Sequence, residues 1–88
     1  MWQVIYRKKS RKLLDRLPER QRYRIESAIE KLRENPFYRD DLDTKKLEAS
    51  ENWRLRVGDW RIIYYLYEKR LLIEIIEIGP RGDVYKGK

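Results

Sequence analysis

The chain has 88 residues, of which 42% are charged and 41% hydrophobic, and its formal net charge is +7. This length allows one small domain, spanning residues 1–88, with a single core. The absence of cysteine and histidine excludes a disulfide framework, a thiolate or imidazole metal site and a histidine base. We therefore expect neither a metal ion nor another cofactor.

The sequence also predicts where the protein acts. Its first ten residues contain no apolar run long enough for a signal peptide, and no later run approaches the roughly 20 residues that span a bilayer. We therefore expect a cytoplasmic protein that has no membrane partner.

The first half of the sequence predicts a strand and a helical hairpin. Residues 2–7 alternate between apolar and polar side chains, as a strand does. Ser10 is suited to cap a short amphipathic helix that stops at Pro18, because proline disfavours helical geometry in the residue before it. Pro18 then opens a second helix, which we expect to end near Asn35 and Pro36.

The second half predicts a three-stranded antiparallel meander. Residues 37–50 are polar and lack sustained periodicity, so we interpret them as a connecting loop. Strands follow at residues 53–57, 60–67 and about 71–78, with Gly58 and Asp59 as the first turn. The expected fold is α+β: an N-terminal strand, a helical hairpin and the meander, with the helices packed on one face of a four-stranded sheet.

Three arginines share one face of the first hairpin. A two-residue turn at Gly58 pairs Arg56 with Arg61, and strand alternation places Arg54 on the same side. Like charges directly opposite one another destabilise a sheet by roughly 0.2–1 kcal/mol, so folding alone gives no reason to cluster them. Binding of a polyanion does give a reason.

The other face of these strands is apolar, and we expect it to meet the helices. Its residues are Trp53, Leu55, Val57, Trp60, Ile62, Tyr64 and Leu66. The arginine face also carries Ile63, Tyr65 and Tyr67. We expect that face to be open and to suit RNA, because guanidinium groups grip phosphate and aromatic rings stack on bases.

Positive charge is concentrated toward the two ends of the sequence. Nine basic and two acidic residues lie between Arg7 and Arg24. A basic flank beside an arginine-lined sheet is the electrostatic pattern expected of a nucleic-acid binder, although a solvated helix face explains the N-terminal run equally well. The candidate nucleic-acid-binding residues are Lys8, Lys9, Arg11, Lys12, Lys45 and Lys46.

Two segments together resemble a known family. The hairpin segment KKLEASENWRLRVGDWRIIYYL and the terminal IGPRGDVY resemble the RelE toxins of bacterial and archaeal toxin–antitoxin modules, and the likeness covers nearly the whole chain. It implies a RelE-like fold, similar to that of microbial ribonucleases. It also implies an mRNA endonuclease that cuts the codon in the ribosomal A site and is held inactive by a RelB-like antitoxin. Carried over to this sequence, the catalytic residues are Arg54, Arg56, Arg61, Arg81 and Tyr85.

The arginines meet only part of what this reaction needs. Attack of a ribose 2′-OH on the adjacent phosphate requires a base, an acid and stabilisation of charge on phosphorus. Arginine supplies the third, but its pKa above about 12 makes Arg54 and Arg56 poor bases, and the best-known family members carry lysine there. Tyr85 is suited to stack on a base or, with a lowered pKa, to move a proton. Turns and ion pairs explain the nearby carboxylates better: Glu48, Glu51, Asp59 and Asp83.

Two other functions are compatible with the sequence. A ParE-like toxin shares the fold but poisons DNA gyrase and is not an enzyme, and the combination of Arg61, Arg81 and Tyr85 favours the nuclease over it. The other is a catalytically idle RNA-binding relative, since arginine replaces lysine in the site. A toxin this basic is expected to be neutralised by an acidic, amphipathic antitoxin segment.

Overall fold

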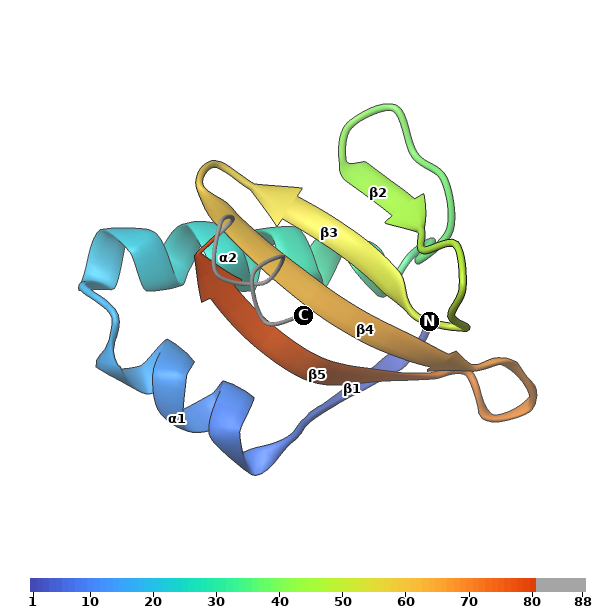
Figure 1. Ribbon diagram of the computed structural model, residues 1–88, viewed down its shortest axis with the longest axis horizontal. Helices are drawn as coiled ribbons and strands as arrows, with labels where there is room; N and C mark the ends of the chain where they lie inside the picture. Colours follow the sequence, from blue (N-terminus) through green and yellow to red (C-terminus); the bar gives the residue numbers. More distant parts are fainter. Residues whose placement is uncertain (81–88) are drawn as a thin grey trace.

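The computed structural model describes residues 1–80 of the chain. Figure 1 shows its helices and strands. In chain order they are β1 (Gln3–Tyr6), α1 (Lys8–Arg16), α2 (Glu19–Leu32), β2 (Asp43–Lys46), β3 (Trp53–Val57), β4 (Trp60–Tyr67), a short 3-10 turn (Glu68–Arg70) and β5 (Leu72–Pro80). The α+β fold is confirmed, and β3 and β4 have the predicted boundaries.

The five strands form one mixed sheet in the order β1-β5-β4-β3-β2. β1 pairs in parallel with β5, and the other neighbours are antiparallel. The prediction of four strands was wrong, because part of the expected loop forms the edge strand β2. This strand consists of polar residues and needs only backbone pairing along one side, so no apolar alternation could reveal it.

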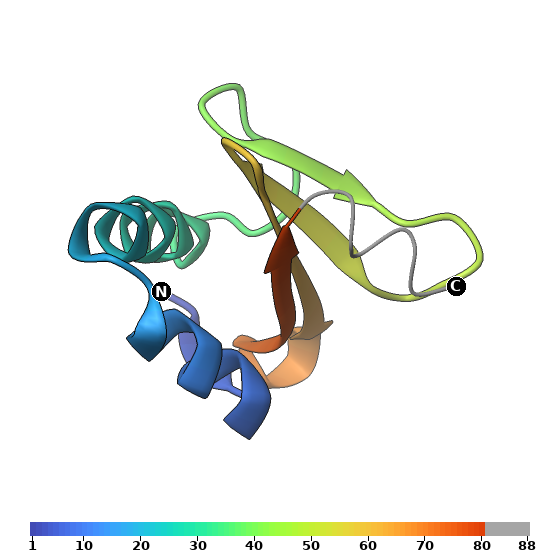
Figure 2. The same cartoon turned by 60° about the vertical axis from the view of Figure 1, so that its left-hand side comes forward.

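Both helices lie on the same side of the sheet, as Figure 2 shows. α1 packs against β5 and α2 against β3. The helices bury a set of apolar side chains against the strands, namely Leu14 of α1 and Ile25, Ala28, Ile29 and Leu32 of α2. Within residues 1–80 no helix is long and apolar enough to cross a membrane, since even α2 has only 14 residues.

The start of α1 differs from the prediction. The helix begins at Lys8, directly after the extended residue Arg7, so Ser10 is its third residue and does not cap it. Ser10 is instead buried, with 2% of its surface exposed, and lines the same hollow as Ile78 of β5. The serine was misassigned because a small polar residue before an apolar run is typical of a helix cap, whereas here its small size lets α1 approach the sheet.

The core lies between the helices and the sheet. As predicted, it contains Trp53, Leu55, Ile62, Tyr64 and Leu66, with Val57 and Trp60 at its margin. The hydroxyl of the fully buried Tyr64 donates a hydrogen bond to the carbonyl of Pro36 at 2.8 Å. Burial raises the pKa of Tyr64, so the hydroxyl stays protonated and ties the segment after α2 to the centre of the sheet.

A tight turn sets the register of the central hairpin. Gly58 has a φ of +57°, which is the left-handed region that glycine adopts readily. Val57 therefore pairs with Trp60 and Arg56 with Arg61, as predicted. This pairing decides which side chains of β3 and β4 face the helices.

Glu74 of β5 joins the start of the chain to the sheet. Its carboxylate accepts hydrogen bonds from Nε of Arg7 at 3.0 Å and from the hydroxyl of Tyr67 at 2.8 Å. The bond from Arg7, and then that from Tyr67, lowers the pKa of Glu74, whereas the bond to Glu74 raises the pKa of Tyr67. Because Arg7 links β1 to α1, this contact helps to hold β1 beside β5.

Substitution of the turn glycine tests how the hairpin register is stabilised. Gly58→Ala forces an ordinary side chain into the left-handed region, and its Cβ would lie 3.0 Å from Nη2 of Arg24. We expect the free energy of unfolding in urea to fall by about 1–2 kcal/mol. Gly58→Asn is the matched control, because asparagine tolerates this conformation and should lose less. Equal losses in the two variants would contradict the backbone explanation.

The Glu74 contact predicts an acid-sensitive part of the stability. A carboxyl group whose pKa is lowered on folding stabilises the protein above its unfolded pKa of about 4.3, and this contribution disappears as the pH falls through the lower folded value. Glu74→Gln should therefore reduce the free energy of unfolding on the order of 0.5 kcal/mol at pH 7 and by less near pH 3. Urea denaturation at both pH values measures this, with Glu77→Gln, an exposed glutamate of the same strand, as control. A loss that does not depend on pH would rule out the ionic explanation.

Candidate functional site

The three arginines of the hairpin lie on the face of the sheet that the helices leave uncovered. Arg56 of β3 is paired directly with Arg61 of β4, and Arg54 lies two residues earlier along β3. The core residues of the same strands point to the other side. The structure thus brings together these three of the five predicted catalytic residues. The other two, Arg81 and Tyr85, lie outside the described residues.

This part of the face is not open, contrary to the prediction. Arg61 is 2% exposed and Arg54 6% exposed, and the neighbouring Ile63 is also buried. Arg56 is the most accessible of the three arginines, with 30% of its side chain exposed. Arg61 is on a central strand between Arg56 and Gly79, so its side chain has neighbours on both sides. A sequence pattern assigns a side chain to a face but does not say what surrounds it there.

Asp43 of β2 is a carboxylate that contacts two of these arginines, Arg54 and Arg56. Its Oδ1 lies 3.2 Å from Nη1 of Arg54, and its Oδ2 lies 3.6 Å from Nη1 of Arg56. Asp43 is absent from the predicted site residues because the sequence pattern of residues 37–50 indicates a loop. The acidic residues there were a signal, but only the register of β2 against β3, which pairs Asp43 with Arg56, singles out Asp43.

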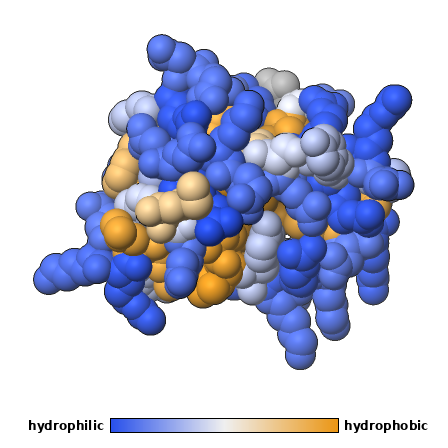
Figure 3. All heavy atoms as spheres, turned by 180° about the vertical axis from the view of Figure 1, so that it is seen from behind, coloured by the Kyte–Doolittle hydropathy of each residue, from blue (hydrophilic) through white to orange (hydrophobic). Residues whose placement is uncertain are grey.

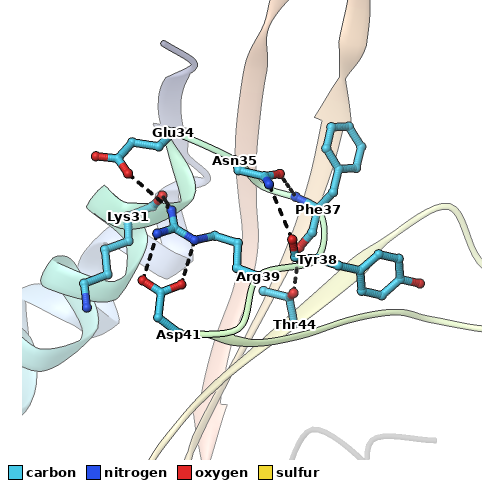
Figure 4. A network of polar contacts seen from close by, with 8 residues as sticks. All are labelled: Lys31, Glu34, Asn35, Phe37, Tyr38, Arg39, Asp41 and Thr44. Carbon is cyan, nitrogen blue, oxygen red and sulfur yellow. Dashed lines mark hydrogen bonds and ion pairs between the residues drawn. The ribbon is translucent and has the colours of Figure 1, made fainter.

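The connection between α2 and β2 is held in place by polar contacts (Figure 4). Arg39 is at its centre and binds both carboxylate oxygens of Asp41, at 2.7 and 2.8 Å, and the carbonyl of Lys31 at the end of α2. The hydroxyl of Thr44 donates to the carbonyl of Phe37 at 2.6 Å. These contacts fix the approach of the chain to β2, and with it the place of Asp43.

The two predicted nucleic-acid-binding lysines of β2 point in opposite directions. Lys45 is paired with Arg54 and shares the arginine face. Lys46 belongs to the other side of the strand, where its Nζ donates to the carbonyl of Ser50 at 3.1 Å and lies 3.5 Å from Glu51. Only Lys45 therefore adds to the positive charge beside the arginines.

The predicted basic residues of α1 do not join the arginine face, because α1 packs on the core side of the sheet. Lys8, Lys9 and Lys12 are exposed there. Arg11 is engaged within the protein: it binds Asp15 at 2.8 Å and stacks on the ring of Tyr6 at 4.7 Å. Figure 3, seen from behind the view of Figure 1, shows hydrophilic side chains over most of that surface. The basic run of α1 therefore lies apart from the arginine face.

The arginine face continues along β4 into an aromatic hollow. The rings of Tyr65 and Tyr67 meet edge to face, with 4.8 Å between their centroids. They line a hollow of about 390 Å³ together with Arg7, Asn52, Glu74 and Ile76. This face therefore has arginines at one end and half-exposed tyrosines at the other. Proteins that bind single-stranded nucleic acids combine cationic and aromatic side chains in this way.

No cluster of three or more aspartate or glutamate side chains close enough to hold a metal ion occurs within residues 1–80. The arginines of the described face offer electrostatic stabilisation. Guanidinium groups close to or within the protein surface act more strongly on a phosphate than they would in water, because the local dielectric constant is lower.

Comparison with known proteins identifies the family. The family model described as the ParE toxin of the type II toxin–antitoxin system parDE matches residues 4–85. A candidate RelE1 toxin of Methanocaldococcus jannaschii is 33% identical over 72 residues, which cover 80% of this chain and 79% of that protein.

Solved structures show the same fold. The RelE–RelB complex of Pyrococcus horikoshii OT3 contains a chain with 32% identity and a TM-score of 0.81, covering 92% of this chain and 96% of that one. The RelB–RelE complex of Methanococcus jannaschii contains a chain with 26% identity and a TM-score of 0.76, and the match covers 96% of this chain and 98% of that one. The isolated RelE toxin of E. coli, at 15% identity and a TM-score of 0.78, covers 99% of this chain and 94% of that one and shares the fold. The chain belongs to the RelE/ParE family of toxins from type II toxin–antitoxin modules.

Proposed function

We propose that this toxin is a metal-independent endoribonuclease that cleaves mRNA in the ribosomal A site and so inhibits translation in the cytoplasm. The observation that carries the proposal is the grouping of Arg54, Arg56 and Arg61 on one face of the β3–β4 hairpin. Two directly opposed arginines destabilise a sheet, whereas their combined positive charge suits the binding of a phosphodiester.

In the reaction the ribose 2′-OH loses its proton and attacks the neighbouring phosphorus, and the P–O5′ bond breaks. The released 5′ oxygen takes up a proton, so the products are a 2′,3′-cyclic phosphate and a 5′-OH. Arg56, the most exposed of the three arginines, is suited to contact a phosphate oxygen directly. The buried guanidinium groups of Arg54 and Arg61 stabilise the added negative charge from beneath it. Arg81 and Tyr85 would complete the site, with Tyr85 stacking on a base.

The proposed site lacks a good proton acceptor among its arginines, and this explains a need for the ribosome. With a pKa above about 12, arginine does not release its proton at neutral pH. Rate enhancement must then come from charge stabilisation and from holding the 2′-OH in line with the P–O5′ bond. The ribosome would impose that geometry, and the exposed Lys8, Lys9 and Lys12 of α1 would contact the ribosomal RNA backbone.

The proposed regulatory partner is a RelB-like antitoxin. The Pyrococcus and Methanococcus relatives were solved as complexes of RelE with RelB. A formal net charge of +7 favours an acidic segment that neutralises the toxin. An amphipathic helix or strand would supply it.

Gyrase inhibition is the second candidate function. It is favoured by the family model, whose description names the ParE toxin, and it needs no catalytic site. In that case the arginine face would bind a protein instead of RNA.

Primer extension on mRNA held in programmed ribosomes, beside the same mRNA free in solution, tests the proposal. The native protein should cut within the A-site codon only on ribosomes. Arg56→Ala should slow cleavage about 100-fold, as loss of one charge-stabilising donor does. Lys69→Ala, which removes a basic residue of the 3-10 turn before β5, should cleave like the native protein.

Two further measurements make the result decisive. Thermal unfolding of each variant shows whether a loss of cleavage reflects a loss of fold. Intact mRNA at high concentrations of folded native protein would rule out the nuclease, and inhibition of gyrase supercoiling by the same sample would establish the alternative.

A further inference from the structure

The carboxylate of Asp43 lies between two guanidinium groups of the proposed site. Each of its oxygens faces a different arginine, with Oδ1 at 3.2 Å from Arg54 and Oδ2 at 3.6 Å from Arg56. A phosphodiester also presents two negatively charged oxygens, and arginine binds carboxylate and phosphate with the same donor geometry. Arg54 and Arg56 thus already form an anion site, and the protein's own side chain occupies it.

The fold holds this carboxylate in place. Asp43 is paired with Arg56 across the β2–β3 ladder, so the two side chains lie next to each other on one face. The following residue, Thr44, is anchored to the carbonyl of Phe37, and the preceding turn is closed by Arg39 and Asp41. A tethered carboxylate competes for the site at a high effective concentration.

The same geometry lets the carboxylate leave. Asp43 is on an edge strand, and 51% of its side chain is exposed, so rotation of the side chain takes it into water. Arg56 stays within reach of an incoming ligand, because 30% of its side chain is exposed. Exchange of one anion for another at these guanidinium groups therefore needs no movement of the backbone.

We propose that Asp43 is the internal ligand of the anion site formed by Arg54 and Arg56, and that a phosphate of the bound RNA takes this site by displacing it. The inference rests on the proposed function for its ligand, single-stranded RNA. It identifies Asp43 as a residue that sets the affinity of the site for RNA. In the free toxin, Asp43 prevents the two arginines from binding anions from solution. In the complex with RNA, the phosphate replaces the Asp43 carboxylate.

Removal of this one charge should strengthen RNA binding in a characteristic way. In Asp43→Asn the arginines bind anions from solution, and a phosphate then releases those anions when it binds. Affinity for RNA should rise about fivefold, since two partly exposed ion pairs no longer compete with it. The slope of log K against log salt concentration should become steeper, because the release of solution anions from the arginines adds to the release of cations from the RNA.

Fluorescence anisotropy with a single-stranded RNA carrying 2′-O-methyl riboses measures both quantities for the full chain over a series of salt concentrations. This probe cannot be cleaved, because its 2′ oxygens are blocked. Asp40→Asn is the matched control: it removes the same charge from an exposed position in the turn before β2. We expect it to change affinity less than twofold and to leave the slope unaltered.

Every outcome decides the inference. Tighter binding and a steeper slope in Asp43→Asn alone support it, and so does binding by this variant when the native protein shows none. Equal effects in the two variants would show that only overall charge matters. Weaker binding in Asp43→Asn would show that the carboxylate orients the arginines without competing, and no binding by any protein would also overturn it.

The test is separable from that of the proposed function. Cleavage on ribosomes by the native protein, together with unchanged RNA binding by Asp43→Asn, would refute only the role of Asp43. Tighter RNA binding by Asp43→Asn without any cleavage on ribosomes would refute only the nuclease.

Discussion

The register of the β3–β4 hairpin is the constraint on which the rest of this molecule depends. Gly58 turns the chain in two residues, and the pairing of Val57 with Trp60 then assigns every side chain of both strands to a face. The helices can cover only the apolar face, because burial of its aliphatic and aromatic groups is the main favourable term in folding. A slip of one residue would exchange the two faces and put arginines into the core.

The cost of this arrangement is a concentration of positive charge on the opposite face. Arg54, Arg56 and Arg61 are held close together, and two of them are nearly fully buried. Asp43 from the edge strand offsets part of the repulsion in the free protein. The described part of this face therefore concentrates positive charge.

The other half of the same face has a different character. Tyr65 and Tyr67 follow Arg61 along β4, and Glu74 holds the hydroxyl of Tyr67. Arginines and aromatic rings therefore succeed each other along one strand, as in proteins that bind single-stranded nucleic acid. The basic helix α1 lies on the core side, so the described part of the protein presents two separate positive surfaces.

Sequence by itself determined the α+β class, the boundaries of β3 and β4, the core face of the hairpin and the arginine pair, because alternation and turn chemistry are local properties. Tertiary structure alone decided the rest. It made β2 a strand by pairing its backbone with β3, buried Arg54 and Arg61, and placed α1 away from the arginines. It also selected Asp43 from several acidic residues, because contact between an aspartate and an arginine 11 residues away depends on strand register and not on composition.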